Sequence, residues 1–279
     1  MLRALFFAIL TGMQRVHFIG IGGIGMSALA RYYKHNGWRV TGSDAAESAI
    51  TRALRKEGIR VFRNHAASHV VPATTRAIAS LAIDEKNPEL RRARALNIPV
   101  LQYAEAVGEL TRHYTTIAIS GSHGKSTTTS LLGLILTRAG LDPTVIVGTN
   151  LREFGPPGGE ASGINFRAGK SKYLVLEADE WGKSFHHYTP YIAIVTNIDK
   201  EHLDIYKNFA GIVKGFVEYL RNVRSGGVIV ANAGSKGVQE AIRQLPITNY
   251  QLPVHVIWYN KDRFTKHKLG IPGKHNQEN

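Results

Sequence analysis

The sequence has no cysteine among its 279 residues. A disulfide framework, a thiolate metal site and a cysteine nucleophile are therefore excluded, and the absence fits a reducing compartment. Long apolar runs are missing too, because the opening "MLRALFFAIL" is far too short to cross a bilayer. It also lacks a clear small-residue cleavage site, so we interpret residues 1–13 as an N-terminal extension and expect a cytoplasmic protein without a membrane partner.

A long basic run is absent as well, although 35 Lys and Arg against 21 Asp and Glu give a net charge of +14. The positive charges are spread along the chain, which argues against a nucleic-acid partner; anionic small-molecule substrates explain them at least as well. Internal repeats and low-complexity segments are not found. The length and an apolar fraction of 43% indicate an ordinary globular chain of two domains.

Glycines dominate the first motif, "VHFIGIGGIGMSALARYYKHNGWRVTGSD" (16–44). The pattern predicts a strand over 16–19, a helix from about Met26 that Gly37 ends, and a second strand that ends on Asp44. The motif G-x-G-x-x-G is satisfied by Gly20, Gly22 and Gly25. Asp44 follows about 20 positions later, where a dinucleotide-binding fold places the acid that holds a ribose hydroxyl. Taken alone this indicates NAD, but the same glycines serve any pyrophosphate, or only tight strand–helix packing.

The segment that follows continues the alternation of strands and helices. Strand-like pieces are predicted at 60–63, 76–80 and 98–101, and helices at about 88–96 and 103–114. Such an alternation is typical of a parallel sheet that is covered by helices. We therefore predict a Rossmann-like domain over residues 14–112, with a boundary near residue 112.

A second glycine loop, "ISGSHGKSTTT" (119–129), lies between a predicted strand at 114–120 and a predicted helix at 126–140. It resembles the phosphate loop G-x-x-x-x-G-K-[ST], with Lys125 and Ser126 in place but Ile119 where the first glycine belongs. Backbone N–H groups at a helix N-terminus bind anions, so Lys125 would reach phosphates and Ser126 would bind Mg²⁺. An ordinary turn with a solvated lysine is the alternative. The helix is predicted to bury one apolar face, made of Leu131, Leu132, Ile135 and Leu136.

Acidic side chains follow two later predicted strands. A Gly- and Pro-rich stretch at 148–171 is predicted to be loop-like. Beyond it, one strand delivers Glu177, Asp179 and Glu180, and the next delivers Asn197, Asp199, Glu201, His202 and Asp204. Carboxylates at strand ends beside a phosphate loop suit Mg²⁺, which prefers oxygen ligands. A zinc site at His202 is disfavoured, because no second His stands at metal spacing. Solvated loop charge is the alternative for the acids.

Five blocks of the chain resemble the Mur ligases of peptidoglycan synthesis, in the right order over roughly residues 14 to 279. They are "HFIGIGGIGMSALARYYKHNGWRVTGSD", "SGSHGKSTTTS", "LEADE", "AIVTNIDKEHLDIY" and "IPGKHNQEN". The resemblance implies an α/β fold: an N-terminal Rossmann-like parallel-sheet domain that binds a UDP-sugar, then a phosphate-loop-type α/β central domain that binds ATP (113–279). It also implies that the ligand of the first glycine motif is a UDP-sugar rather than NAD, since a UDP-sugar likewise has a pyrophosphate and a ribose.

The activity that the resemblance implies is an ATP- and Mg²⁺-dependent ligation of L-alanine to the carboxylate of UDP-N-acetylmuramate, through an acyl phosphate. It assigns catalysis to Lys125, Glu177 and His202, and the metal to Ser126, Glu177 and His202. ATP contacts are implied for Gly121, Ser122, His123, Gly124, Lys125, Ser126, Thr127, Asn276 and Asn279. UDP-sugar contacts are implied for Gly20, Gly22, Gly23, Gly25, Met26, Ser27 and Asp44. The family's tripeptide-recycling ligase stays open as an alternative.

The sequence also departs from the family pattern. Trp181 and Gly182 stand where a further acid is common, and "IASLAI" (78–83) replaces a serine-rich loop. Nothing in the sequence corresponds to the family's C-terminal domain, so we expect this chain alone not to ligate at an appreciable rate. The alternative function is then a UDP-sugar- and ATP-binding module, with a separately encoded C-terminal domain as a candidate partner.

Overall fold

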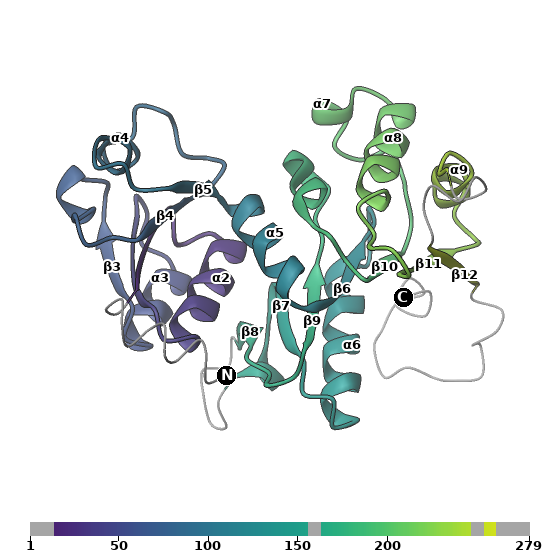
Figure 1. Ribbon diagram of the computed structural model, residues 1–279, viewed down its shortest axis with the longest axis horizontal. Coiled ribbons are helices and arrows are strands. Elements are labelled where there is room, and N and C mark those ends of the chain that lie inside the picture. The colour runs from purple at the N-terminus through teal and green to yellow at the C-terminus, as the bar shows by residue number, and fades with distance from the viewer. Residues whose placement is uncertain (1–13, 156–162, 247–253, 261–279) are drawn as a thin grey trace. The chain divides into compact units, whose positions relative to one another are not determined.

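The computed structural model describes residues 14–155, 163–246 and 254–260, which Figure 1 shows as coloured ribbon. The chain divides into two compact units, Met1–Ala106 and Val107–Asn279. The division falls inside helix α5 (Tyr103–His113), whose last residues lie at the boundary predicted near 112. No helix in these ranges is long and apolar enough to span a membrane.

The described strands of the first unit form a five-stranded sheet in the order β3-β2-β1-β4-β5. Every neighbouring pair is parallel. Its elements are β1 (Arg15–Ile19), α2 (Ile24–His35), β2 (Arg39–Asp44), α3 (Ala49–Lys56), β3 (Arg60–Arg63), β4 (Arg76–Ala79), α4 (Pro88–Ala95) and β5 (Val100–Gln102). The strand order reverses between β1 and β4, which is the switch point where open α/β sheets bind ligands. The predicted Rossmann-like sheet is therefore present.

Local signals explain where the helices of this unit begin. The Ser48 side chain accepts the Thr51 N–H, and the Thr51 side chain accepts the Ser48 N–H, a capping box that starts α3. Asn87 accepts the N–H groups of Glu89 and Leu90 at the start of α4, with Pro88 in the first turn, as the sequence predicted. Helix α2 begins at Ile24, two residues before the predicted Met26.

The described strands of the second unit form a seven-stranded sheet in the order β12-β11-β10-β6-β9-β7-β8. It is parallel except for β8, which runs antiparallel to β7. The strands are β6 (Thr115–Ser120), β7 (Thr144–Leu151), β8 (Ile164–Arg167), β9 (Tyr173–Glu177), β10 (Ile192–Val195), β11 (Val228–Asn232) and β12 (His255–Tyr259). The helices are α6 (Lys125–Arg138), α7 (Leu203–Tyr206), α8 (Phe209–Leu220) and α9 (Lys236–Arg243). Strand β6 lies between β9 and β10, so the loops that follow these three strands meet at one edge.

The described parts of the stretch at 148–171 contain regular elements, although its glycines and prolines predicted a loop. Strand β7 continues to Leu151, a short 3-10 helix covers Arg152–Phe154, and β8 pairs Phe166 with Ile146. Both Phe154 and Phe166 are buried. Burial of these two aromatic side chains outweighs the local preference of the surrounding residues for turns.

Helix α6 buries the predicted face only in part. Ile135 is 59% exposed, whereas Thr129, Ser130 and Gly133 are buried. A Cβ on Gly133 would lie 3.1 Å from the Val145 side chain, so the helix approaches the sheet through its small residues. The predicted leucines pack less deeply: Leu132 and Leu136 are partly buried against the core cluster around Val145.

Candidate functional site

The loop between β6 and α6 depends on two glycines. Gly121 has a φ of +139°, and a Cβ there would lie 2.1 Å from the Thr196 Oγ1. Gly124 has a φ of +79° and is the N-cap of α6, so the helix begins directly at Lys125. Only glycine adopts these conformations without strain. The N–H groups of the first turn thus lie at a helix N-terminus, the local geometry that binds anions.

The end of strand β10 holds this loop in place. The Asn197 side chain accepts the His123 N–H at 2.8 Å and donates to the His123 carbonyl at 3.1 Å. Thr196 Oγ1 donates to the same carbonyl at 2.7 Å, and the Ser122 N–H donates to the Asn197 carbonyl at 3.0 Å. Sequence reasoning placed Asn197 among the polar residues after a strand but gave it no such role. The clamp fixes the shape of the loop before any ligand arrives.

Lys125 points back over its own loop toward an acid. Its Nζ donates to the Gly121 carbonyl at 2.7 Å and to the Ser122 carbonyl at 3.3 Å. It also lies 3.1 Å from Oε1 and 3.0 Å from Oε2 of Glu180. The lysine side chain is 12% exposed and the glutamate side chain 2% exposed, so this is a largely buried ion pair. The loop carbonyls and Glu180 therefore hold the Lys125 amine at the start of α6, where the sequence predicted that it would contact phosphates.

Ser126 and Glu177 form a second contact at the same edge of the sheet. The Ser126 hydroxyl donates to Glu177 Oε1 at 2.8 Å, and the Gly148 N–H donates to Oε2 at 2.6 Å. Burial raises the pKa of Glu177 above its ordinary value, although both hydrogen bonds and the charge of Lys125 act to lower it. A nearby cation would favour the charged carboxylate.

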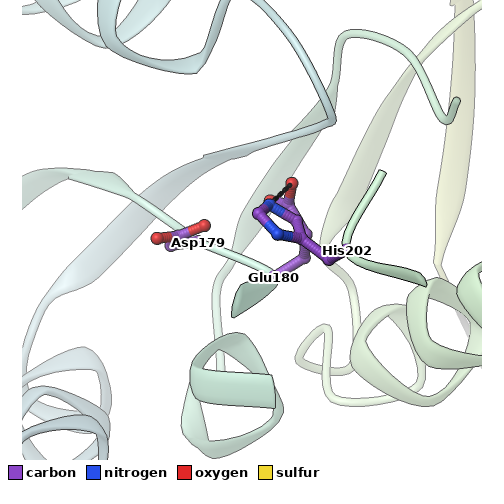
Figure 2. Close-up of side chains that lie close together, drawn as sticks. All are labelled: Asp179, Glu180 and His202. Atoms are coloured by element: carbon purple, nitrogen blue, oxygen red, sulfur yellow. Dashed lines mark ion pairs between the residues drawn. The ribbon is translucent and has the colours of Figure 1, made fainter. Parts of the chain in front are cut away.

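Three side chains from the segments that follow β9 and β10 lie close together, as Figure 2 shows. Asp179, Glu180 and His202 each offer a ligand atom, and these atoms all lie within 4.8 Å of one another. His202 Nε2 lies 3.5 Å from Glu180 Oε1. The backbone of His202 has a φ of +53°, an uncommon conformation for a non-glycine residue that directs its side chain.

The donors at this edge are those of a site for a hard cation. Burial raises the pKa of Glu180 as it does that of Glu177, and Lys125 is the main charge that opposes the rise. The buried Glu180 carboxylate, the partly buried Glu177 carboxylate and the Ser126 hydroxyl supply oxygen ligands, which Mg²⁺ prefers. A divalent ion would stabilise the ionised carboxylates that burial disfavours. The residues present therefore fit Mg²⁺.

A cavity of about 1210 Å³ opens beside the loop within the second unit. His123, Gly124 and Asn197 line it on the loop side, and Asn232, Lys236 and Tyr259 line it on the side of β11, α9 and β12. This volume is ample for a nucleotide-sized ligand. The loop with a helix N-terminus, the Lys125 amine, the acids after β9 and a large cavity thus lie at the carboxyl edge of one sheet.

Comparison with known proteins accounts for both units. The profile of the Mur ligase family catalytic domain matches residues 15–115, and that of the Mur ligase middle domain matches residues 119–254. The chain belongs to the Mur ligase family. It is 45% identical over 218 residues to the UDP-N-acetylmuramate–L-alanine ligase of Acidobacterium capsulatum, which covers 78% of this chain and 46% of that protein. The UDP-N-acetylmuramate–L-alanine ligase of Caldanaerobacter subterraneus is 38% identical to this chain over 284 residues. The match covers 94% of this chain and 60% of that protein.

Two solved Mur ligase structures share the fold. The UDP-N-acetylmuramate-alanine ligase of Thermotoga maritima has a TM-score of 0.71 at 31% identity, over 82% of this chain and 51% of that one. The second structure is the UDP-N-acetylmuramate:L-alanyl-γ-D-glutamyl-meso-diaminopimelate ligase of Neisseria meningitides. It has a TM-score of 0.76 at 26% identity, and the match covers 88% of this chain and 78% of that one. The chain spans about half the length of the first curated relatives it matches.

The front glycine loop of this Mur ligase chain is organised around Asp44. The Gly22 N–H donates to Asp44 Oδ2 at 2.8 Å, and the Ala46 N–H donates to Oδ1 at 3.0 Å. A Cβ on Gly22 would lie 2.7 Å from the same carboxylate, and a Cβ on Gly25 would lie 2.6 Å from the Tyr103 ring. Close packing therefore requires both glycines, whatever they bind. Gly20, with a φ of +84°, makes the turn that follows β1.

The other residues that the sequence singled out lie as follows. Met26 and Ser27 are buried, and the Ser27 hydroxyl donates to the Ile24 carbonyl at 2.8 Å. Gly23 is exposed. The His123 ring, 61% exposed, lies 3.4 Å from Glu201 and 3.9 Å from Asp199. Thr127 lies in the first turn of α6; Asn276 and Asn279 lie outside the described residues.

Within the second unit, the structure places Lys125, Ser126, Glu177 and His202 near one another. Glu180 is the residue whose role the sequence missed, because it joins Lys125 to His202. The block "LEADE" contains Glu180, but the sequence alone does not predict which of its three acids is buried. Asp179 is exposed and Glu180 is buried, and only the backbone path after β9 decides this.

Proposed function

We propose that this chain carries the UDP-N-acetylmuramate and ATP sites of a UDP-N-acetylmuramate–L-alanine ligase. The observation that carries the proposal is the gathering of Lys125, the Ser126–Glu177 pair and the Glu180–His202 pair at one sheet edge. It is supported by curated relatives of that name that are 36% to 46% identical to the chain.

The reaction requires activation of a carboxylate, which is a poor electrophile. The muramoyl carboxylate attacks the γ-phosphorus of ATP, the bond to the β–γ bridging oxygen breaks, and ADP leaves. The amine of L-alanine then attacks the acyl phosphate, phosphate departs, and the amine loses a proton. Catalysis of such transfers depends mainly on positioning and on neutralising phosphate charge.

Lys125 is the residue of this chain best placed to hold the phosphates. Its amine now contacts two loop carbonyls and Glu180. To bind a phosphate it exchanges Glu180 for the phosphate oxygens while the loop carbonyls keep it oriented. The released Glu180 carboxylate then becomes available to a cation. The free α6 N–H groups add to the anion site.

Ser126 and Glu177 would hold Mg²⁺ at the phosphates, and His202 with Glu180 would hold a second position beside the transferred group. The bound ion supplies neutralisation of the phosphate charge during transfer. Asp179, 54% exposed, reaches within 3.9 Å of Lys125 and completes the acidic lining. The use of ATP and of a nucleotide-sugar precursor assigns the proposed reaction to the cytoplasm.

The front unit would take the UDP part of the substrate. Its glycine loop follows β1 at the switch point of the sheet, the usual place for a pyrophosphate. Asp44 accepts one N–H with each carboxylate oxygen, and each oxygen retains capacity for a second donor from the nucleotide.

A thermal-shift comparison tests the front site. UDP-N-acetylmuramate is expected to raise the melting temperature of the chain, and NAD at the same concentration to leave it unchanged, because uracil and sugar contacts decide the preference. Stabilisation by NAD with no response to the UDP-sugar would overturn the assignment.

A product assay tests the reaction itself. The purified chain is incubated with ATP, Mg²⁺, UDP-N-acetylmuramate and L-alanine, and UDP-N-acetylmuramoyl-L-alanine is measured by mass spectrometry. Product that depends on L-alanine supports the proposal, and product only with the tripeptide supports the recycling ligase. Binding of both nucleotides without product would identify the chain as a binding module.

A further inference from the structure

Four strands of the front unit begin with arginine: Arg15 of β1, Arg39 of β2, Arg60 of β3 and Arg76 of β4. Arg76 pairs with Val16 and so lies on the other face of the sheet from Arg15. The register pairs Arg15 with Arg39, and Arg60 with Thr41, two residues beyond Arg39. Side chains paired across parallel strands, or two residues apart on one strand, share a face of the sheet. The guanidinium groups of Arg15, Arg39 and Arg60 therefore start from one face at the amino edge of the sheet.

A cavity of about 490 Å³ lies at this edge. Arg15, Arg39 and Arg60 line it together with Lys34 from α2. Among the described residues that line it, none is acidic. The described glutamates of this unit with printed arginine partners form their ion pairs elsewhere: Glu57 with Arg31, Glu47 with Arg55 and Arg63, and Glu85 with Arg94. Four cations that share a concave site without an acid repel one another, and an anionic ligand would relieve that repulsion.

One wall of the cavity is a stack of flat groups. The Arg60 guanidinium lies 4.7 Å from the centre of the Phe62 ring. The Phe62 ring stacks on His69 with 3.9 Å between centroids and 7° between planes. His69 is fixed in turn by Glu89, whose Oε1 lies 2.6 Å from its Nδ1. Trp38 lines the same cavity. The wall is thus rigid and presents aromatic surface beside the cations.

The cavity is separate from the proposed UDP-sugar site. The glycine loop follows the carboxyl end of β1, whereas Arg15 begins the strand. Five residues at about 3.3 Å each put roughly 15 Å of strand between the two ends. A ligand in this cavity therefore takes no part in the proposed ligation.

We propose that this cavity binds a small phosphorylated molecule that carries at least two negative charges. Guanidinium groups match phosphate oxygens in pairs, and charge-assisted hydrogen bonds of this kind are the strong ones. The volume suits a small ligand rather than a segment of protein. The site goes beyond the proposed ligase activity and depends on none of its residues.

Trp38 makes the proposal testable by fluorescence. The chain has three Trp, and the two others, Trp181 and Trp258, are 46% and 42% exposed in the second unit. The variant Trp181→Phe/Trp258→Phe keeps Trp38 as the sole reporter. It is titrated at constant ionic strength with inorganic pyrophosphate, adenosine monophosphate, citrate and a 12-base-pair DNA duplex. A saturable change in Trp38 emission with pyrophosphate or the nucleotide is expected. Tighter binding of the nucleotide shows that the aromatic wall contributes, and tighter binding of pyrophosphate shows that charge alone suffices.

A matched pair of charge variants separates the site from general basicity. Arg39→Gln/Arg60→Gln in the same background is expected to weaken pyrophosphate binding about tenfold or more. Arg52→Gln/Arg91→Gln removes the same charge from exposed positions outside the cavity and is expected to change affinity less than about twofold. Lys125→Ala is expected to leave the Trp38 signal unchanged.

Several results would overturn the proposal. One is the absence of a saturable change in Trp38 emission with either phosphate probe, and another is an equal loss of pyrophosphate affinity in the two double-arginine variants. The proposal would also fail if citrate bound as tightly as pyrophosphate. It would fail as well if the DNA duplex bound more tightly than the small anions and its binding depended on Arg39 and Arg60. Circular dichroism of each variant shows whether it is folded, and the arginines concerned are exposed or partly exposed.

Discussion

Each unit of this protein buries a glutamate, and the two are treated in opposite ways. Glu89 of the front unit is 0% exposed, and Glu180 of the second unit is 2% exposed. Burial acts to raise the pKa of Glu89, but contacts from His17, Ser43 and His65 lower it to about 2. Burial also raises the pKa of Glu180, and there Lys125 fails to reverse the effect. One buried acid is fully compensated and the other is not.

The partners explain the difference. Glu89 has His65 Nδ1 at 2.9 Å, His69 Nδ1 at 2.6 Å and His17 Nε2 at 3.5 Å, and Ser43 donates to it as well. Glu180 has Lys125 and, at 3.5 Å, His202. Glu89 therefore ties β1, β2 and α4 together as a structural centre. Glu180 lies next to the loop between β6 and α6, and its negative charge is only partly compensated. This is expected of a carboxylate that binds a cation.

The largest effect is expected from Glu89→Gln. The substitution leaves three histidines and a serine around a neutral amide, and removing a charged acceptor from buried hydrogen bonds costs about 3 kcal/mol. Urea unfolding followed by Trp38 fluorescence in the single-tryptophan background reports the front unit. Glu85→Gln, which removes an exposed carboxylate from a surface pair, should leave that transition unchanged; equal midpoints for the two variants would contradict the structural role of Glu89.

The pH dependence should have opposite signs for the two acids. The lowered pKa of Glu89 means that its contribution is present above about pH 4.5 and is lost as the pH falls toward about 2. The unfolding free energy of Glu89→Gln minus that of the parent should thus rise toward zero, by about 3 kcal/mol, as the pH falls through that window. The raised pKa of Glu180 means that its ionisation costs stability as the pH rises above 4.5. The same difference for Glu180→Gln should therefore increase with pH. Denaturation series from pH 2 to 8 give both slopes, and slopes of equal sign would refute the comparison.

Lys125→Ala should weaken ATP binding about tenfold, which is about 1.4 kcal/mol. The variant removes the cation opposite the phosphates and leaves the Glu180 carboxylate facing them. Calorimetry with ATP and Mg²⁺ measures the change, and Lys214→Ala, an exposed lysine of α8, is the matched control. Unchanged affinity in Lys125→Ala would mean that the loop binds no phosphate.

Tyr206→Phe should have the smallest effect. The buried Tyr206 hydroxyl donates to the Glu180 carbonyl at 2.7 Å. Its removal leaves a backbone acceptor unpaired, which costs about 1 kcal/mol. Tyr191→Phe, at a position 37% exposed, is the control. The free energy of unfolding of the two variants is compared by Trp181 fluorescence in a background of Trp38→Phe/Trp258→Phe. A loss of unfolding free energy no larger than in the control would show that the Tyr206 hydroxyl does not hold the Glu180 backbone.

The elements that sequence predicted well are those whose signals are local. Strand β1, its glycine loop and the acid at the end of β2 lie within 30 residues of one another and were found together. Helix α4 was found from its Pro88. Strand β8 was missed because its pairing with β7 depends on partners across a Gly- and Pro-rich stretch. The buried face of α6 was predicted only in part, because Gly133 permits a close approach to the sheet that apolar periodicity does not reveal.

The sequence by itself determined the anion loop, its lysine and serine, and the parallel sheets that present them, because glycine conformations and apolar runs act over a few residues. Tertiary structure alone decided which acids turn inward. Glu180 rather than Asp179 pairs with Lys125, Asn197 clamps the loop, and His17, His65 and His69 surround Glu89. These contacts join residues of different helices, strands and loops. The sheet order and the depth of burial set both their distances and the sign of each pKa shift.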